Sequence, residues 1–138
     1  MDLFTVHPDS VNDMWPLIQP HLLQFEQSIG TASAEEIRLQ AIDGQAQIWG
    51  VATPDGVRGV CITRMHETPR NKFCSIWAAI GDDVFKDILK VYAEIEKWAL
   101  DNGCSAMEIS GRRGWMRVLP GYKEVSVVMH KDLIGVRH

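Results

Sequence analysis

Hydrophobic residues recur at helical spacing in the first third of the chain. Leu3–Val6 is a short β-prone run that His7-Pro8 ends, and Asp9-Ser10 then offers an N-cap. The apolar positions that follow are spaced for one helical face: Val11, Met14, Trp15, Leu17 and Ile18. The pattern predicts a helix that begins at about residue 11.

Two further signals divide this helical region. Pro20 lacks the amide hydrogen that a helix interior needs, so we expect a break near Gln19 and a second helical piece over His21–Ser28. Ser33-x-x-Glu36 matches a capping box, in which each residue satisfies a backbone amide of the other. It predicts another short helix that ends at about residue 42.

The hydrophobic period shortens to two residues after residue 45. Three alternating runs predict strands: Gln47–Ala52, Val57–Thr63 and Phe73–Ile80. Pro54–Gly56 marks a tight turn between the first two runs, and the polar residues Glu67–Lys72 separate the second run from the third. The sequence therefore predicts an antiparallel meander of three strands.

The helical period returns over Val84–Asp101. A short strand, a helical turn and a last alternating strand are expected after it, over Ala106–Ser110, Trp115–Leu119 and Lys123–Leu133. Because a helix separates Phe73–Ile80 from Ala106–Ser110, a right-handed crossover makes these two strands parallel neighbours. The predicted fold class is α/β (α+β), a mixed sheet in which an antiparallel meander carries one parallel pair and helices flank both.

Composition and length set the class of protein. The 138 residues form one domain, 1–138, and 46% hydrophobic with 23% charged residues is ordinary for a globular chain. A formal net charge of -4 argues against dedicated nucleic-acid binding. No apolar run reaches the ~20 residues that span a bilayer, and the first residues lack a basic signal segment. We expect an intracellular, cytoplasmic protein with no membrane partner.

Charge and cysteines add two points. Met1–Asp55 holds eight acidic residues and one basic residue, whereas Gly111–His138 holds six basic and two acidic residues, so the C-terminal end is a candidate anion site. The cysteines, Cys61, Cys74 and Cys104, show no C-x-x-C spacing. We interpret them as reduced and structural, and we expect no metal cofactor.

The order of elements and the C-terminal segment resemble one family. The segment reads Gly111-Arg-Arg-Gly-Trp115, then Leu119-Pro-Gly-Tyr122, then His130-Lys-Asp-Leu133. It resembles the final strand–helix–strand of the GCN5-related N-acetyltransferases (the GNAT superfamily), in which a Gly-Phe/Tyr pair precedes the last strand. His7-Pro8, Trp15-Pro16, Gln47–Trp49 and Ile76-Trp77 look more closely like small GNAT-like proteins of bacteriophages and prophages.

The resemblance implies acetyl-CoA or another acyl-CoA as cofactor. In the family the pantetheine arm lies along the strand that corresponds to Ile76–Ile80, which assigns cofactor binding to Ile76, Ala78, Ala79, Ile80 and Gly81. The pyrophosphate sits at the N-terminus of the following helix. Here Asp82 and Asp83 occupy that loop, and their carboxylates repel phosphate, so we expect weak acetyl-CoA binding. Two other roles for Asp82 and Asp83 stay open. They could cap the following helix, or they could bind a metal together with Glu67 or Glu108.

Acyl transfer needs a base for the amine and an acid for the departing thiolate. The resemblance implies Glu67 as the base, with His66 and Glu108 as the other residues near the expected strand positions. The tyrosine that often serves as the acid in the family is replaced by Arg117. Tyr122, in the Gly-Tyr pair, is the remaining phenol, and it also fits simple core packing.

Arg112, Arg113 and Arg117 form a candidate anion or partner site. In the predicted topology the first two lie at the same sheet edge as Asp82 and Asp83, so they either pair with these carboxylates or capture an anionic ligand. Two functions stay open. One is an acyl-CoA-dependent N-acyltransferase with a degenerate cofactor loop and an unknown amine substrate. The other is a non-catalytic phage structural, assembly or host-interaction protein, and in either case the chain could form a homo-oligomer.

Overall fold

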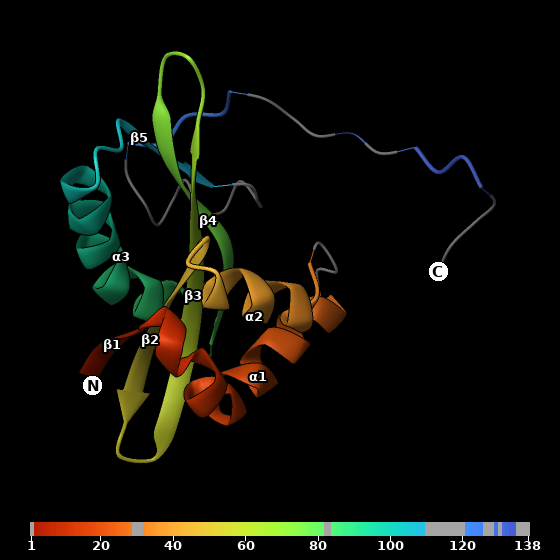
Figure 1. Ribbon diagram of the computed structural model, residues 1–138, viewed down its shortest axis with the longest axis vertical. Helices are drawn as coiled ribbons and strands as arrows, with labels where there is room; N and C mark the ends of the chain where they lie inside the picture. The colour runs from red at the N-terminus through yellow and green to blue at the C-terminus, as the bar shows by residue number, and fades with distance from the viewer. Residues whose placement is uncertain are drawn as a thin grey trace.

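The computed structural model describes residues 2–28, 32–81, 84–109, 121–125, 129 and 131–134. In chain order the elements are β1 (Asp2–Val6), a short 3-10 turn η1 (Pro8–Ser10), α1 (Val11–Ser28), α2 (Ala34–Ile42), β2 (Ala46–Thr53), β3 (Gly56–Glu67), β4 (Lys72–Gly81), α3 (Val84–Asp101) and β5 (Ala106–Ile109). Figure 1 shows them with these labels. None of the helices that are described has the length and apolar character to cross a bilayer.

The strands form one mixed sheet in the order β1-β2-β3-β4-β5. The first four pair in antiparallel fashion, whereas β4 and β5 pair in parallel from Phe73 with Ala106 to Ile76 with Ile109. Helix α3 makes the crossover between these two strands, as the sequence predicts. The predicted fold class is therefore confirmed.

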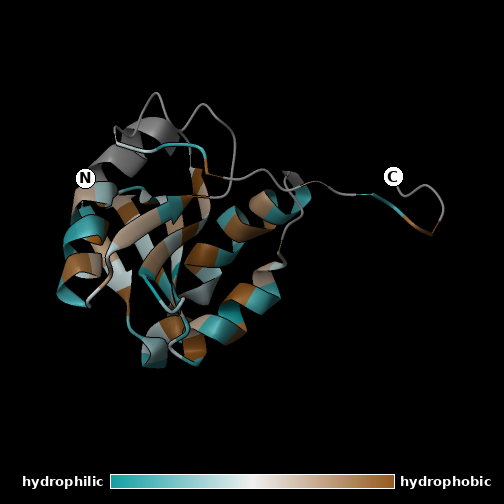
Figure 2. Cartoon of the chain, turned by 90° about the horizontal axis from the view of Figure 1, so that it is seen from above, coloured by the Kyte–Doolittle hydropathy of each residue, from teal (hydrophilic) through white to brown (hydrophobic). Residues whose placement is uncertain are grey.

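Helices cover the sheet on both sides (Figures 1 and 2). Helices α1 and α2 pack on one face, which we call the α1 face, over a core that includes Ile18, Leu22, Ile37, Ile48 and Ile62. Helix α3 packs on the other, the α3 face, where Val91 and Ile95 of the helix meet strand residues that include Trp49, Val51, Cys61, Cys74 and Ile76. Because alternate residues of each strand point to opposite faces, the strands contribute side chains to two separate cores, as expected for a sheet that is covered on both faces.

Helix α1 corrects one prediction. It continues without interruption through Pro16 and Pro20, so the break expected near Gln19 is wrong. Both prolines are on the exposed side of the helix, where water can hydrogen-bond the carbonyl groups that lose their amide partners. The buried face repeats through the proline region as Val11, Trp15, Ile18, Leu22 and Phe25, and this packing holds the helix together.

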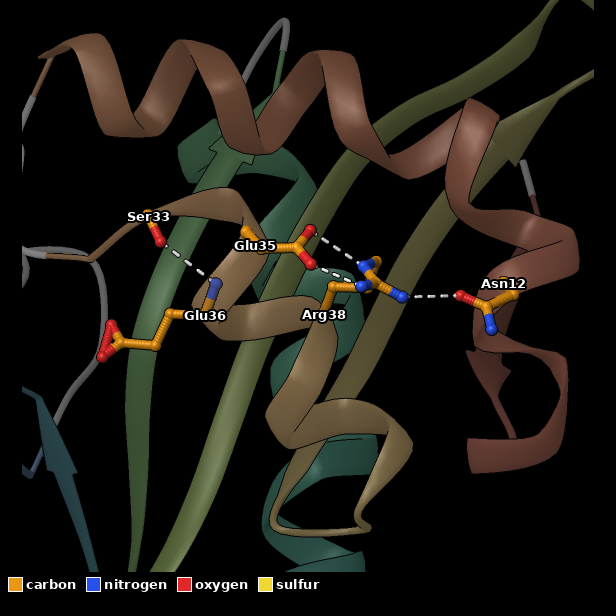
Figure 3. A network of polar contacts seen from close by, with 5 residues as sticks. All are labelled: Asn12, Ser33, Glu35, Glu36 and Arg38. Carbon is orange, nitrogen blue, oxygen red and sulfur yellow. Dashed lines mark hydrogen bonds and ion pairs between the residues drawn. The ribbon is translucent and has the colours of Figure 1, made fainter.

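The N-terminus of α2 confirms the predicted cap. The Ser33 hydroxyl accepts a hydrogen bond from the Glu36 amide at 3.0 Å. Figure 3 shows that Arg38, one turn further on, lies between the Glu35 carboxylate and the Asn12 side chain, to which it donates at 2.9 Å. This exposed network links α2 to the first turn of α1.

The strands of the meander are longer than the alternation indicates. β3 runs to Glu67 and β4 begins at Lys72, so the connecting loop is only residues 68–71. The pairing also contains a β-bulge, because Ile62 faces Ala78 while Thr63 faces Ile76, which leaves Trp77 as the extra residue of β4. Polar residues at the strand ends are compatible with a sheet edge that extends beyond the helices.

The predicted last strand, Lys123–Leu133, is not formed by the residues of that range that the structure describes. Val125, Met129 and Leu133 are between 78% and 88% exposed. Residues 126–128 and 130 of this range lie outside the described residues, so the strand as a whole stays a prediction. Among the described residues β5 pairs with β4 alone.

Candidate functional site

The described pairing between β4 and β5 covers only the first part of β4. It runs from Phe73 with Ala106 to Ile76 with Ile109, whereas β4 continues to Gly81 and is paired there with Gly59 of β3. Within the described part of the chain, no strand pairs with residues 77–81 on the side of β5. The backbone amides and carbonyls of residues 77–81 that no described strand pairs can hydrogen-bond a ligand, so this part of β4, which we call the β4–β5 opening, is a candidate ligand site.

The five residues expected to bind the cofactor lie on this strand. Ile76 is buried and pairs with Ile109, at the point where β5 ends its pairing. The other four, Ala78, Ala79, Ile80 and Gly81, follow the bulge and form the part of β4 without a β5 partner. The structure thus places these residues at the opening, and their role in binding stays a prediction.

A polar cluster lies beside the opening on the α1 face of the sheet. The Ser75 hydroxyl donates to Glu108 Oε1 at 2.9 Å, and His66 Nε2 lies 3.1 Å from the same oxygen. His66 also stacks on Phe73, with 5.0 Å between the ring centroids. The side chains of His66 and Glu108 are each 45% exposed. The cluster therefore holds a carboxylate in a fixed place that a solute can still reach.

An arginine, Arg64, lies on the same face of the sheet, directly across the strands from the polar cluster. Arg64 pairs across the strands with Ser75, and Ser75 pairs with Glu108, so the three side chains lie on one face. The guanidinium of Arg64 is 3.6 Å from the centroid of the Trp77 ring, which is a cation–π contact. Trp77 itself packs against the core of the α1 face.

The expected bases separate in the structure. His66 and Glu108 come together although 42 residues separate them in the chain. Glu67 is exposed at the end of β3 opposite Lys72, and strand alternation turns its side chain away from the face that carries His66. Nothing in the described structure brings Glu67 to the β4–β5 opening.

Tyr122 lies against helix α3. Its hydroxyl is 2.7 Å from the hydroxyl of Tyr92, and both phenols are half-buried. Burial raises the pKa of Tyr122 and, to a lesser degree, that of Tyr92, and the nearby Glu96 carboxylate adds to both shifts. Tyr122 therefore stays a protonated phenol that is a weaker acid than a free tyrosine, and its role as the acid stays a prediction.

The α3 face of the same strands is closed. Cys61, Cys74 and Cys104 are free and buried, as the sequence predicts. Burial raises the pKa of Cys74 to about 12 and raises that of Cys61 still further. Since the thiolate is the nucleophile, Cys61 and Cys74 are poor nucleophiles in the folded protein.

A cavity of about 330 Å³ lies elsewhere, between α3 and the strands β1 and β2. Its walls include Thr5, Gln47, Lys97 and Trp98. Gln47 accepts a hydrogen bond from the buried hydroxyl of Thr63, which in turn accepts one from the Trp49 indole. None of the predicted site residues that the structure describes lines this cavity.

Several predicted residues lie outside the described residues. They are the two carboxylates of the expected phosphate loop and the three arginines of the expected anion site: Asp82, Asp83, Arg112, Arg113 and Arg117. Their pairing or ligand binding stays a prediction.

Solved structures share this fold. An aminoglycoside acetyltransferase from an uncultured soil metagenomic sample, in complex with trehalose, matches with a TM-score of 0.72 and 10% identity over 96% of this chain and 95% of its own. The ribosomal-protein-alanine N-acetyltransferase of Brucella melitensis biovar Abortus 2308 matches with a TM-score of 0.65 and 14% identity over 95% and 99%. A probable acetyltransferase matches with a TM-score of 0.70 and 8% identity over 99% and 100%.

Neither a known family model nor a curated protein matches the sequence. The likeness is thus one of structure, and the chain has the fold of the GNAT-type acetyltransferases.

Proposed function

We propose that this chain is an N-acyltransferase that takes its acyl group from acyl-CoA and transfers it at the β4–β5 opening. The observation that carries the proposal is the position of Glu108. Its half-exposed carboxylate is held by Ser75 and His66, one residue before Ile109, which forms the last described pair of β5 with β4. Fold likeness alone does not assign function, so the argument depends on this carboxylate.

The opening suits the donor. The pantetheine arm of acyl-CoA carries amide groups, and these can bond to the unpaired side of β4 as an added strand would. Ala78, Ala79, Ile80 and Gly81 would make these bonds through their backbone groups. Asp82 and Asp83 follow Gly81 in the sequence, and their carboxylates would repel the pyrophosphate of acyl-CoA. We therefore propose that the protein binds acyl-CoA weakly and works at high acyl-CoA concentration.

The transfer assigns a task to each polar group. The amine nitrogen attacks the thioester carbonyl carbon, the new N–C bond forms and the C–S bond breaks. Glu108, supported by His66, accepts the proton that the amine loses. The departing thiolate of CoA takes one proton, for which Tyr122 is the proposed donor.

Release of free CoA tests this function. The protein is mixed with acetyl-CoA at millimolar concentration and a panel of primary amines, and thiol appearance is followed. We expect amine-dependent release that Glu108→Gln lowers by about 10²- to 10⁴-fold. Glu94→Gln, an exposed carboxylate on α3, is the matched control and keeps the parent rate. Equal rates in the parent and Glu108→Gln would contradict the proposal.

A second candidate is a non-catalytic GNAT-fold protein that serves phage structure, assembly or host interaction. The observation that favours it is the acidic pair Asp82-Asp83 in place of a phosphate-binding loop. The same assay separates the two, because a non-catalytic protein releases no CoA with any amine. Acyl-CoA is an intracellular metabolite, so the enzymatic proposal also places the protein in the bacterial cytoplasm.

A further inference from the structure

We propose that the acceptor is an amine that also carries an anionic group, and that Arg64 binds this group while Glu108 receives the amine. The inference rests on the proposed acyl transfer and names its substrate class. The anion is an oxyanion, either a carboxylate or a phosphate, since a guanidinium recognises both through the same pair of N–H bonds.

The sheet register sets the geometry of this site. Arg64 faces Ser75 and Ser75 faces Glu108, on three adjacent strands. Neighbouring strands are about 4.8 Å apart, so the backbones of Arg64 and Glu108 are about 10 Å apart. Directly opposed residues share one face of the sheet, and the row therefore presents a cation, a hydroxyl and a carboxylate in sequence.

Arg64 is preorganised for an anion. Its guanidinium stacks on Trp77, and stacking occupies the face of the group but leaves the N–H donors at its edge available. Trp77 is the bulge residue, and a bulge turns a side chain out of the regular alternation. The bulge and the stack together hold Arg64 beside the β4–β5 opening.

The two charged groups do not neutralise each other. Among the described residues, the polar contacts of Glu108 are with Ser75 and His66, and both are made by one oxygen, Oε1. Among the ion pairs of the described residues, none joins Arg64 to Glu108. A ligand with an ammonium at one end and an oxyanion at the other complements both groups, whereas a simple amine complements Glu108 only.

Matched acceptor pairs test the inference. The probes are β-alanine against β-alaninamide, and O-phosphoethanolamine against ethanolamine, each in the CoA-release assay. We expect the parent protein to prefer the anionic member of at least one pair by about 10- to 100-fold in kcat/KM. Preference in the first pair identifies a carboxylate, and preference in the second identifies a phosphate.

Two variants assign that preference to a residue. Arg64→Gln is expected to raise KM for the anionic probes and to leave the neutral probes unchanged. Arg70→Gln, in the exposed loop between β3 and β4, is the matched control and keeps the preference. No preference in the parent, or a preference that survives in Arg64→Gln, overturns the inference.

A binding measurement separates this inference from the proposed function. The ¹H–¹⁵N resonance of Arg64 Nε is followed while β-alanine, O-phosphoethanolamine and ethanolamine are each titrated without a donor. A shift with an anionic probe and none with ethanolamine supports the anion site even if no probe is acylated, in which case only acyl transfer fails. The absence of a shift with both anionic probes overturns the anion site.

Discussion

The two faces of β4 differ in what they can do. Cys74 and Ile76 point into the α3 face and are buried in its core. Ser75, between them, points to the α1 face and shares the half-exposed cluster with Glu108. Alternate residues of β4 thus point to opposite faces of the sheet, one into a buried core and the other into a half-exposed polar cluster.

Burial is the physical cause of the difference. On the α3 face it raises the pKa of Cys61 and Cys74, so both thiols stay protonated and shielded. On the α1 face the helices do not extend over Glu108 and His66, which remain 45% exposed. The half-exposed pair His66 and Glu108 therefore lies on the open face, whereas the buried thiols lie on the closed one.

The largest expected effect is on the closed face. Ile95 is completely buried against the sheet, and Ile95→Ala should lower the free energy of unfolding by about 2–5 kcal/mol, because it leaves a cavity in the core of the α3 face. Urea denaturation measures this loss. Glu108→Gln on the open face should change the same quantity by less than about 0.5 kcal/mol. A loss below about 1 kcal/mol for Ile95→Ala would contradict the claim that the core of the α3 face stabilises the fold.

The second largest expected effect is a loss of folding stability at alkaline pH, caused by the buried groups of the closed face. The ordinary pKa of a cysteine is 9.0, and burial raises that of Cys74 to about 12 in the folded state. The unfolded chain therefore loses protons first, and stability is full below pH 9 and falls as pH rises toward 12. Tyr122 and Tyr92, whose pKa values are also raised, contribute with the same sign above pH 10.

Urea denaturation at several pH values between 8 and 11 checks this decline. Cys74→Ala removes one of the groups responsible, so its free energy of unfolding should fall less steeply with pH than that of the parent. Identical slopes would show that Cys74 ionises equally in both states.

The smallest expected effect lies outside β4. Ser33→Ala removes the side-chain acceptor of the Glu36 amide and should cost about 1 kcal/mol of stability. Ser33→Asp keeps an acceptor and should restore most of the loss. Thermal unfolding of the three proteins provides the comparison, and acyl transfer should be unaffected because α2 lies away from the opening. An intact melting temperature in Ser33→Ala would show that the cap is not formed in solution.

Much of the fold follows from periodicity. The helix Val84–Asp101 has the predicted bounds, and the strand order with its parallel pair follows from the crossover rule. The break at Pro20 was wrong because the sequence rule treats the proline by itself, whereas the continuous buried face of α1 stabilises the helix across it.

The site could be predicted only in part. The bases His66 and Glu108 could be named as candidates from their strands, but their contact depends on the register between β3, β4 and β5. Alternation gives the face of a residue and not its partner across the sheet. The stack of Arg64 on Trp77 depends in addition on a bulge of one residue, for which the alternating pattern gives no signal.

The most direct test of the account compares one substitution on each face of the strands in a single experiment. CoA release from acetyl-CoA with a primary amine, and the free energy of unfolding, are measured for the parent, Glu108→Gln and Cys74→Ala. The account predicts that Glu108→Gln loses at least about 100-fold in rate and keeps its stability, whereas Cys74→Ala loses about 1 kcal/mol or more of stability and keeps its rate. Full activity in Glu108→Gln, or loss of activity in folded Cys74→Ala, would contradict it.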